Sequence, residues 1–562
     1  MQLSEQEIIR REKLNKLQAM GINPYPAELY PVNHTSKQIK NDFKEGKQVI
    51  VAGRLMSARV QGKASFAELQ DSEGRVQLYI NRDEICPGED KTLYNEVFKK
   101  LIDLGDFIGV EGELFTTQVG EKTLRAKNLV LLSKSLRPLP LPKTDADGKV
   151  FDAFTDPELR YRMRYVDLVV NPKNKDIFIK RTKLFQAMRE FFNQAGYIEV
   201  ETPILQSIPG GAAARPFVTH HNALDIPLYL RIANELYLKR LIVGGFDGVY
   251  EFAKNFRNEG MDRTHNPEFT VMEIYVAYKD YNWMMDFTER LLENCAVAVN
   301  GTTTSTFGKH EINWKAPYPR VSMREAILKY TGFDIEGKSE EAIRKAAVEM
   351  GIDVNETMGK GKLIDEIFGE KCEPNFIQPT FITDYPVEMS PLTKKHRDNP
   401  ELTERFELMV CGKEIANAYS ELNDPIDQRE RFEEQLKLSE KGDDEAMFID
   451  QDFLRALEFG MPPTSGLGIG MDRLTMFLTN NESIQEVLFF PQMKPEKQLP
   501  KISDDAQAVF NLLQSLGNTT LDNLKSESGL SNKKWDKAIK DLTSNKLAKV
   551  EKTDDGLMVE AI

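Results

Sequence analysis

A proline at every second position in the segment RPLPLP, Arg137 to Pro142, divides this chain of 562 residues. Proline fixes φ and lacks a backbone N–H, so this spacing favours an extended, fairly stiff connector. A chain of this length also exceeds what one hydrophobic core holds, so roughly three or four domains are expected. We therefore expect separate domains on the two sides of the connector.

Before the connector, short alternating stretches predict five β-strands within residues 49–137. The helical segment KTLYNEVFKKLIDLG separates the third strand from the fourth. This arrangement is typical of an OB barrel, a fold whose open face often binds single-stranded nucleic acid. Residues 1–48 are expected to form a helix that ends at Gly21, followed by a proline-rich connector.

After the connector we expect a linker at residues 138–160 and an α+β domain at residues 161–497, where strand and helix patterns intermix. Three further helical patterns and a hairpin around Asp555-Gly556 predict a small winged-helix-like domain at residues 498–562. Such domains bind nucleic acid or protein about equally often. The expected fold class of the whole chain is multidomain α+β.

The composition excludes several classes of protein. The formal net charge is −14, so any nucleic acid must meet a local basic patch. The N-terminus lacks the apolar segment of a secretory signal, and no run approaches the roughly 18 apolar residues of a membrane-spanning helix. The four cysteines are far apart and form no CxxC pair. We expect a cytoplasmic protein without membrane contact and with reduced, buried thiols.

The stretch FRNEGMDRTHNPEFTVMEIY carries charges inside two strand-like runs. Period two predicts a shared face within each strand: Arg257 and Glu259 on the first, and Phe269, Glu273 and Tyr275 on the second. Base rates favour a solvated face with exposed ion pairs. The neighbouring residues are strongly apolar, however, which favours a ligand site in which an arginine meets phosphate or carboxylate.

A second hairpin is predicted in RFELMVCGKEIANAYSELND, with its turn near Gly412. A loop at Gly412-Lys413 would put Glu407 and Glu414 on one face, where two acids repel unless they share a cation. Such a pair suits Mg2+, which one or two carboxylates hold together with phosphate oxygens. The spacing alone favours a metal site no more than an ordinary sheet surface.

Glu414 is out of phase by one residue with Asn417, Tyr419 and Glu421, which share a face of the same strand. A flat strand cannot direct all four side chains into one pocket. We therefore expect a β-bulge between Glu414 and Asn417, because bulges redirect side chains beside active sites.

The segment GLGIGMDR, residues 466–473, is expected to be a glycine-rich turn that leads into a helix. It is a weak dinucleotide fingerprint, because no strand precedes it and no acid follows at the required distance. The alternative is that some of its glycines let the helix pack closely on the sheet. Arg473 near the helix start gains little from the helix dipole unless an anion is bound, so it indicates an anion site.

Together these stretches closely resemble the class II lysyl-tRNA synthetases of bacterial type, here with an extra C-terminal domain. FQAMREFFNQAGYIEVETPIL is similar to motif 1 of that class, FRNEGMDRTHNPEF to motif 2 and GLGIGMDRLTMFLT to motif 3. IPGGAAARPFVTHHNALD and IANAYSELNDP match the lysine-specific members. The resemblance covers about residues 1–497, and three ordered motifs argue against chance.

The resemblance implies a two-step reaction. Lysine and ATP give lysyl-adenylate and pyrophosphate, and lysine then passes to the 3′ end of tRNA-Lys. It also implies a mainly antiparallel catalytic sheet, an OB barrel that reads the anticodon, a homodimer formed through motif 1, and Mg2+ as cofactor. No acid–base residue is expected to be essential, because this chemistry depends on positioning and charge neutralisation.

The resemblance assigns catalytic roles to Arg257 and Arg473. It places six residues around ATP: Arg257, Glu259, His265, Asn266, Phe269 and Arg473. It places seven around lysine: Gly211, Glu235, Glu273, Tyr275, Asn417, Tyr419 and Glu421. Glu407 and Glu414 would hold Mg2+. Acids at the far end of the pocket favour lysine over aspartate, since a site that leaves buried charges unpaired rejects the wrong substrate.

In the barrel, Phe66 and Arg54 are expected to contact the anticodon, Phe66 by stacking on a base. Further candidates are Tyr79 for stacking and three cations for phosphates: Arg59, Lys63 and Arg75. The alternative is that one aromatic ring simply fills the barrel.

Three other functions stay open on this reading. An aspartate or asparagine synthetase would differ in which amino acid supports pyrophosphate exchange. A synthetase-like paralogue that attaches lysine to a protein usually lacks the barrel predicted here. A catalytically silent nucleic-acid-binding protein would have no need of four residues together: Arg257, Glu407, Glu414 and Arg473.

Overall fold

The computed structural model describes residues 3–144, 150–151, 154–212, 214–355, 358–440, 449–495, 502–545, 547–553 and 556–561. The chain divides into two compact units, Met1–Pro491 and Gln492–Ile562. Among the helices of the described residues, none is long and apolar enough to cross a membrane.

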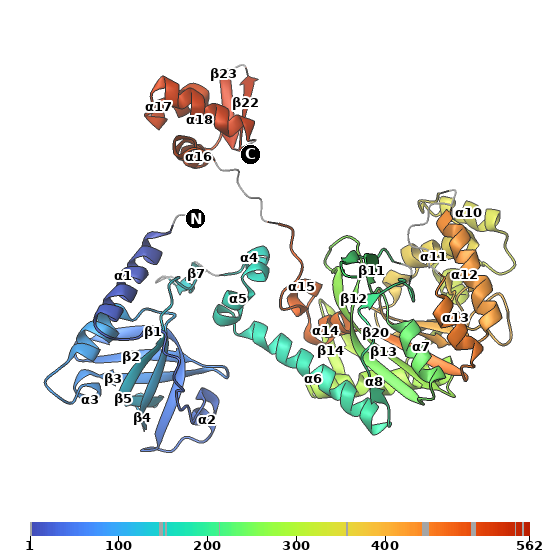
Figure 1. Ribbon diagram of the computed structural model, residues 1–562, viewed down its shortest axis with the longest axis horizontal. Helices are drawn as coiled ribbons and strands as arrows, with labels where there is room; N and C mark the ends of the chain where they lie inside the picture. The colour runs from blue at the N-terminus through green and yellow to red at the C-terminus, as the bar shows by residue number, and fades with distance from the viewer. Residues whose placement is uncertain are drawn as a thin grey trace. The chain divides into compact units, whose positions relative to one another are not determined.

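The N-terminal part of the first unit is a closed five-stranded barrel with the order β1-β2-β3-β5-β4 (Figure 1). Its strands are β1 (Gln48–Gln61), β2 (Ala64–Gln70), β3 (Arg75–Asn81), β4 (Phe107–Thr116) and β5 (Lys122–Ser133). Between β3 and β4 lie α3 (Arg82–Ile85) and a π-helical segment, η1 (Leu93–Leu101). The expected OB barrel with a helix after its third strand is therefore confirmed. Two helices precede it, α1 (Glu5–Ala19) and α2 (Ser36–Asn41).

The rest of the first unit is built on an eight-stranded sheet with the order β16-β17-β18-β19-β20-β13-β12-β8. Its strands are β8 (Ile198–Glu199), β12 (Gly248–Phe256), β13 (Glu268–Ala277), β16 (Arg320–Ser322), β17 (Thr380–Thr383), β18 (Arg405–Val410), β19 (Lys413–Ser420) and β20 (Thr464–Gly470). The pairing is antiparallel except at the two edges, where β16 and β8 run parallel to their neighbours. The sheet is mainly antiparallel, as the sequence predicted.

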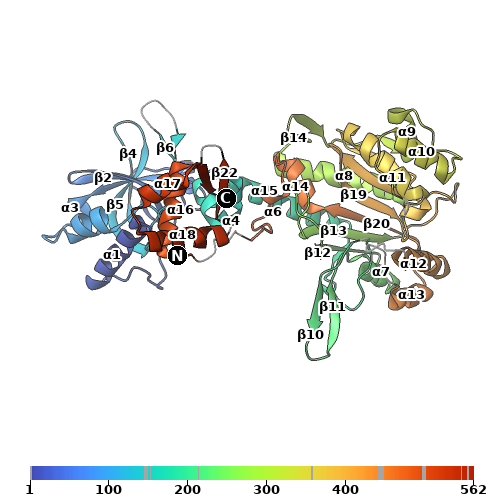
Figure 2. The ribbon, with the colours of Figure 1, turned by 90° about the horizontal axis from the view of Figure 1, so that it is seen from above.

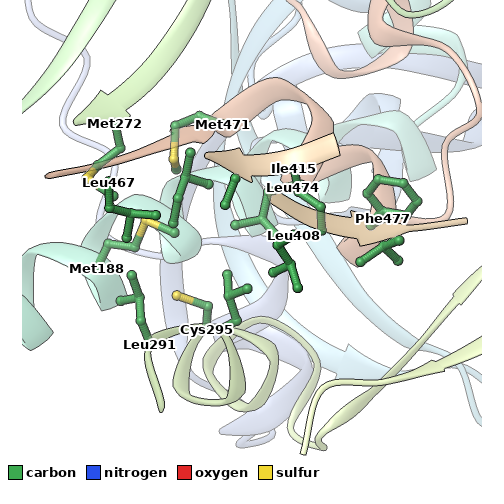
Figure 3. Close-up of a cluster of buried hydrophobic side chains, with 14 of the residues drawn as sticks. Met188, Met272, Leu291, Cys295, Leu408, Ile415, Leu467, Met471, Leu474 and Phe477 are labelled. Atoms are coloured by element: carbon green, nitrogen blue, oxygen red, sulfur yellow. The ribbon is translucent and has the colours of Figure 1, made fainter. Parts of the chain in front are cut away.

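Helices cover one face of this sheet. They are α6 (Lys173–Gln194), α8 (Tyr281–Asn300) and α14 (Met471–Thr479). Figure 3 shows Met188, Leu291 and Cys295 of α6 and α8 beneath apolar side chains of the strands, in one continuous buried core. Burial of this apolar surface is the main force that holds the helices against the sheet. The opposite face of the same strands is left for polar side chains.

Smaller elements surround the sheet. β10 (Val218–His221) and β11 (Ile226–Leu230) form a hairpin that projects from the region of the eight-stranded sheet in Figure 2 and pairs with β9 (Leu205–Gln206). A separate core joins α9 (Met323–Thr331), α10 (Glu340–Glu349) and α11 (Lys360–Lys371). Another joins α7 (Glu235–Val243), α12 (Pro425–Glu440) and α13 (Gln451–Glu458). The remaining elements are β6 (Lys143–Thr144), β7 (Val150–Phe151), β14 (Thr304–Phe307), β15 (His310–Asn313), η2 (Glu373–Asn375) and η3 (Val387–Met389).

The second unit contains α16 (Asp504–Leu516), β21 (Thr519–Thr520), α17 (Leu521–Ser528), α18 (Asn532–Ser544), β22 (Ala548–Thr553) and β23 (Gly556–Ala561). The strands form one sheet with the order β21-β23-β22. Ser531 is the N-cap residue of α18, as expected. Of the predicted turn at Asp555-Gly556, Asp555 lies outside the described residues. Membership of the winged-helix class stays a prediction.

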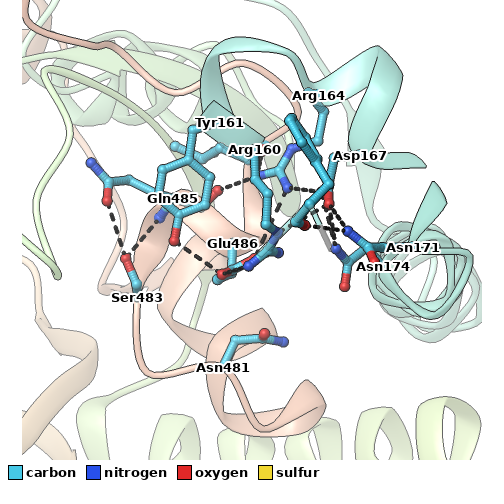
Figure 4. A network of polar contacts seen from close by, with 12 residues as sticks. Arg160, Tyr161, Arg164, Asp167, Asn171, Asn174, Asn481, Ser483, Gln485 and Glu486 are labelled. Carbon is cyan, nitrogen blue, oxygen red and sulfur yellow. Dashed lines mark hydrogen bonds and ion pairs between the residues drawn. The ribbon is translucent and has the colours of Figure 1, made fainter. Parts of the chain in front are cut away.

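A polar network fixes α4 (Pro157–Arg162) and α5 (Arg164–Val170) to α15 (Ile484–Val487), more than 300 residues later in the chain (Figure 4). Arg160 forms a two-pronged contact with the Glu486 carboxylate, at 3.1 and 2.8 Å. The Arg164 side chain, fully buried, donates to Asp167 at 2.7 Å and to the backbone carbonyl of Gln485. Asp167 also accepts from Asn171 and Asn174, so every buried charge here is paired.

We predict that Asp167→Ala lowers the free energy of unfolding by about 3–5 kcal/mol, because it removes the nearest counter-charge of the buried Arg164 guanidinium and leaves only the Glu486 carboxylate, 4.0 Å away. Urea denaturation measures this change. Glu158→Ala is the matched control, since its ion pair with Arg162 is exposed on the Glu158 side and should contribute less than about 1 kcal/mol. Equal effects of the two substitutions would contradict the role given to the network.

Candidate functional site

A cavity of about 720 Å³ opens on the sheet face that the helices leave free. Strands β13, β18, β19 and β20 form its floor, and the loop after β12 and the first turn of α14 form part of its wall. Fourteen of the fifteen residues predicted for ATP, lysine and metal line it: Gly211, Glu235, Arg257, Glu259, His265, Asn266, Phe269, Glu273, Tyr275, Glu407, Glu414, Asn417, Tyr419 and Arg473. Only Glu421 does not.

Strand β13 contributes alternate residues to the two faces of the sheet. Phe269, Glu273 and Tyr275 line the cavity, while Met272 and Ile274 lie in the core beneath the helices. The period-two prediction for this strand is therefore confirmed. The charges of the strand face a shaped cavity instead of bulk water, so the interpretation as a solvated sheet face is wrong.

The prediction that Arg257 and Glu259 lie on a strand is wrong. β12 ends at Phe256, and both residues belong to the loop that connects it to β13. Inside this loop the Asp262 carboxylate accepts hydrogen bonds from the backbone N–H groups of Thr264 and His265, at 2.6 and 2.7 Å. This local turn replaces strand pairing, which is why the alternation stops. Both side chains nevertheless line the cavity.

The loop end of the cavity is rich in cations and aromatic surface. The Arg257 guanidinium lies over the Phe269 ring, 5.1 Å from its centre. Arg473, in the first turn of α14, donates to the backbone carbonyl of Glu414 at 2.8 Å and contacts Nε2 of His265 at 3.2 Å. Two guanidinium groups and one flat ring therefore line the same end of the cavity, an arrangement that suits an anion joined to a planar base.

The hairpin of β18 and β19 turns at Cys411-Gly412, one residue earlier than the expected Gly412-Lys413. Both turn residues have positive φ, 48° and 67°, as a two-residue hairpin turn of type I′ requires. Val410 consequently pairs with Lys413, and Met409 with Glu414.

The predicted bulge is confirmed. Leu408 pairs with Ala416 while Met409 pairs with Glu414, so Ile415 is the extra residue in β19. The bulge brings Glu414 into phase with Asn417 and Tyr419, and all three line the cavity.

Glu407 and Glu414 lie close enough to influence each other's charge. Burial and the neighbouring Glu414 raise the pKa of Glu407 to about 8, although Arg405 opposes this with an ion pair at 2.5 Å. Within the described residues there is no cluster of three or more His, Cys, Asp or Glu side chains that could hold a metal alone. Two mutually repelling carboxylates fit Mg2+, which takes its other ligands from water and phosphate.

At the other end of the cavity, the carboxyl groups of Glu235, Glu273 and Glu421 are buried with one ammonium group, which contacts two of them. Nζ of Lys239 donates to Glu235 at 2.6 Å and also forms an ion pair with Glu421. The Tyr419 hydroxyl donates to Glu235 at 2.8 Å, and the Tyr275 hydroxyl donates to Glu273 at 3.1 Å.

Burial raises the pKa of Glu273 to about 8, and the nearby Glu235 contributes. Burial also raises the pKa of Glu421 well above its ordinary value, against the opposing effect of Lys239. This end of the cavity therefore holds more acidic groups than cations, and a bound cation would favour their ionised forms.

Glu421 lies directly behind the cavity wall, where Gly466 leaves space for it. A Cβ atom on Gly466 would collide with Oε1 of Glu421 and with the Tyr275 ring. The segment that contains Gly466 is the regular strand β20, which leads straight into α14, so the expected glycine-rich turn is wrong. Gly466 makes room for site residues, and close packing of a helix on the sheet does not explain it.

Sequence reasoning missed two residues of this site, Lys239 and Arg405. Lys239 follows Glu235 by four positions on α7, so the helical spacing was a usable signal for their ion pair. Arg405 precedes Glu407 by two positions on β18 and donates to Asn417 at 3.1 Å. Its position on the same strand face was a comparable signal.

In the barrel, Phe66 and Tyr79 pair across β2 and β3, with ring centres 5.3 Å apart. Both are half-buried on the outer surface, next to the ring of Phe115. Neither ring fills the barrel, so that alternative is wrong.

Of the predicted cations, Arg59 pairs opposite Phe66. Arg54 pairs opposite Gln70, four residues or about 13 Å further along β2. There its guanidinium donates to the Gly105 carbonyl and lies over the Phe107 ring. The structure therefore brings Arg59, and not Arg54, to the aromatic surface.

Comparison with known proteins agrees with this geometry. Residues 156–494 match the family model of tRNA synthetases class II (D, K and N), and residues 49–132 match that of the OB-fold nucleic acid binding domain.

Three relatives are lysine–tRNA ligases. The protein from Christiangramia forsetii is 75% identical over 556 residues, which cover 99% of this chain and 98% of the relative. That from Porphyromonas gingivalis W83 is 69% identical over 514 residues, 91% of this chain and 89% of the relative. That from Azobacteroides pseudotrichonymphae is 65% identical over 498 residues, 88% of this chain and 99% of the relative. The chain therefore belongs to the class II tRNA synthetases and, within them, to the family of lysine–tRNA ligases.

Proposed function

We propose that this chain attaches lysine to tRNA-Lys in two steps, through lysyl-adenylate. The observation that carries the proposal is the excess of buried acid in the cavity: Glu235, Glu273 and Glu421 are buried with a single ammonium group, that of Lys239, which pairs with Glu235 and Glu421. Buried charges require partners. The two ammonium groups of lysine, at its α-carbon and at the end of its side chain, supply two positive charges. Aspartate or asparagine would leave the acids unpaired.

Within this proposal, Glu273, Tyr275 and Glu421 hold the ε-ammonium group of lysine. Gly211, Glu235, Asn417 and Tyr419 hold its α-amino acid end. An oxygen of the lysine carboxylate attacks the α-phosphorus of ATP, and pyrophosphate leaves with the bonding electrons. The chain supplies no nucleophile. Its contribution is to align the reacting atoms and to neutralise charge as it develops.

Arg257 and Arg473 carry the catalytic roles at the phosphate end of the cavity. Arg257 contacts the α-phosphate and the lysine carboxylate, where its planar guanidinium can donate two hydrogen bonds. Phe269 and Arg473 enclose the adenine ring, and Glu259 faces its edge. His265 and Asn266 lie near the phosphates.

Glu407 and Glu414 would hold Mg2+ together with phosphate oxygens. When bound, this ion neutralises charge on the phosphates and on the departing pyrophosphate. The mutual repulsion of the two carboxylates supports the assignment, because a shared cation removes it.

The proposal includes a homodimer that works in the cytoplasm, where ATP and tRNA are found. Exposed apolar side chains near motif 1 support the dimer, among them Ile179 of α6, Ile198 of β8 and Leu205 of β9. Apolar side chains gathered in one region suit a contact with a second copy.

Exchange between ATP and labelled pyrophosphate, measured with each of the twenty amino acids, tests the function. We expect lysine alone to support exchange, because among the twenty amino acids only lysine has a side chain that ends in an ammonium group, the compact cation that the buried acids of the cavity would pair with. Exchange with aspartate or asparagine in place of lysine would overturn the proposal.

Lysine binding should depend on pH. With a pKa of about 8, Glu273 carries a proton in the empty site at neutral pH, and an incoming ammonium group favours its ionised form. Lysine binding therefore releases a proton below about pH 8, and affinity should rise with pH by up to roughly tenfold per unit and level off above that pH.

Calorimetry in buffers of different ionisation enthalpy measures this proton release. Glu273→Gln should weaken lysine binding and reduce the release while ATP binding is retained. The same proton release in this variant as in the parent would exclude Glu273 as its source.

Phe66→Ala should raise the KM for tRNA by about tenfold or more, since base–aromatic stacking contributes about 1–3 kcal/mol. Lysine-dependent pyrophosphate exchange should not change. Phe459→Ala is the control, because Phe459 is exposed but lies on the catalytic domain. Equal losses of exchange and of tRNA charging would exclude an anticodon role for Phe66.

A further inference from the structure

Helix α18 of the C-terminal unit has two chemically distinct faces. Trp535, Ala538 and Leu542 are buried in the core of the unit. On the opposite side, Lys533, Lys537 and Lys540 follow one another at spacings of four and three residues and are exposed. Helical geometry brings side chains at these spacings onto a single face. The outward face of α18 is thus a row of three lysines.

One acid lies within the lysine row: the exposed Asp536 comes three residues after Lys533 and four before Lys540, so this face carries three positive charges against one negative charge. Among the residues that the structure describes, no ion pair involves any of its three members, whereas the flanking Lys534 pairs with Asp505 at 3.3 Å. The nearby Asp541 is engaged with the backbone N–H of Ser503 at 2.8 Å.

Some exposed lysines on other helices are paired with an acid one turn away, such as Lys100 with Glu96 and Lys362 with Glu366. Like charges at this spacing cost a helix about 0.2–0.5 kcal/mol per pair. The repulsion between neighbouring lysines of the row is a cost that Asp536 offsets only in part, and an external polyanion would offset more of it.

We propose that the lysine row of α18 binds the phosphate backbone of tRNA, the substrate of the same enzyme. The proposal rests on the ligase function stated above. Lysine acts as a compact point charge that meets phosphate without reading bases. Three lysines along about 10 Å of helix match a strand of phosphates better than a single bound anion.

A protein partner is disfavoured by the chemistry of this face. Protein interfaces are centred on aromatic or apolar anchors and are depleted in lysine. The remaining outward positions of α18 carry polar side chains, among them Asn532, Thr543 and Ser544. They offer no apolar anchor.

The lysine row is on the same chain as the domains expected to bind tRNA, so even a weak contact with tRNA can add to the affinity. Three phosphate contacts alone bind loosely at physiological salt. Once tRNA is held by the catalytic and barrel domains, a row on the same chain meets it at high effective concentration. We expect the row to increase tRNA affinity without taking part in amino acid activation.

The test is the triple variant Lys533→Gln, Lys537→Gln and Lys540→Gln in the full-length protein. Binding of tRNA-Lys is measured between 50 and 200 mM salt. Loss of three phosphate contacts should reduce the slope of log K against log salt by about 2–3 and weaken binding roughly ten- to hundredfold at 0.1 M salt. Lysine-dependent pyrophosphate exchange should equal that of the parent.

Two control variants make the result specific. Replacing the same three lysines by arginine keeps the charge and should retain the slope. Replacing three exposed lysines of the catalytic domain by glutamine, Lys329, Lys338 and Lys345, changes the net charge equally and should leave the slope close to the parent value.

If the triple glutamine variant has the salt slope and the tRNA affinity of the parent, this inference is overturned. A protein partner would then be the better explanation of the exposed lysines of α18. Absence of lysine-dependent exchange in the parent would instead overturn the proposed function, so the two failures are distinguishable.

Discussion

The arrangement of the proposed lysine pocket depends on one buried ammonium group placed between two carboxylates. Lys239 reaches Glu235 on its own helix and Glu421 beyond the end of β19, and so joins two parts of the chain that are almost 200 residues apart. A buried charge is tolerated only with a partner, and here the partners outnumber it. The folded pocket holds more buried acidic groups than cations, and under the proposed function the two ammonium groups of lysine would pair with them. Binding and selectivity then have the same physical origin.

A mainly antiparallel sheet allows charged side chains to gather on one of its faces while apolar side chains on the other face pack against helices. Because side chains alternate, the strands that bury Met272 and Ile274 against helices present Glu273 and Tyr275 on the other side. The bulge at Ile415 shifts this alternation by one residue within β19, so that Glu414 joins Asn417 and Tyr419 in the cavity. The helices supply rigidity, and the free face supplies chemistry.

Positive charge is also concentrated locally in other parts of the chain. The protein is acidic, with a net charge of −14, yet its expected nucleic-acid contacts lie on small local surfaces. An aromatic group with Arg59 beside it lies on the barrel, and the lysine row lies on α18. The net negative charge of the protein repels polyanions in general, while the local cations attract phosphate at these surfaces. This combination favours specific binding of tRNA over nonspecific binding of other polyanions.

Local rules were enough to predict the barrel, the antiparallel catalytic sheet, the bulge and fourteen of the residues that line the cavity, because each follows from short-range periodicity or from a resemblance in ordered motifs. Contacts between distant segments were not accessible in that way. The pairing of Lys239 with Glu421, the space that Gly466 leaves and the separation of Arg54 from Phe66 depend on which strands become neighbours and in which register. Tertiary packing alone decides those, since register is set by burial across the whole sheet and by turn geometry such as that at Cys411-Gly412.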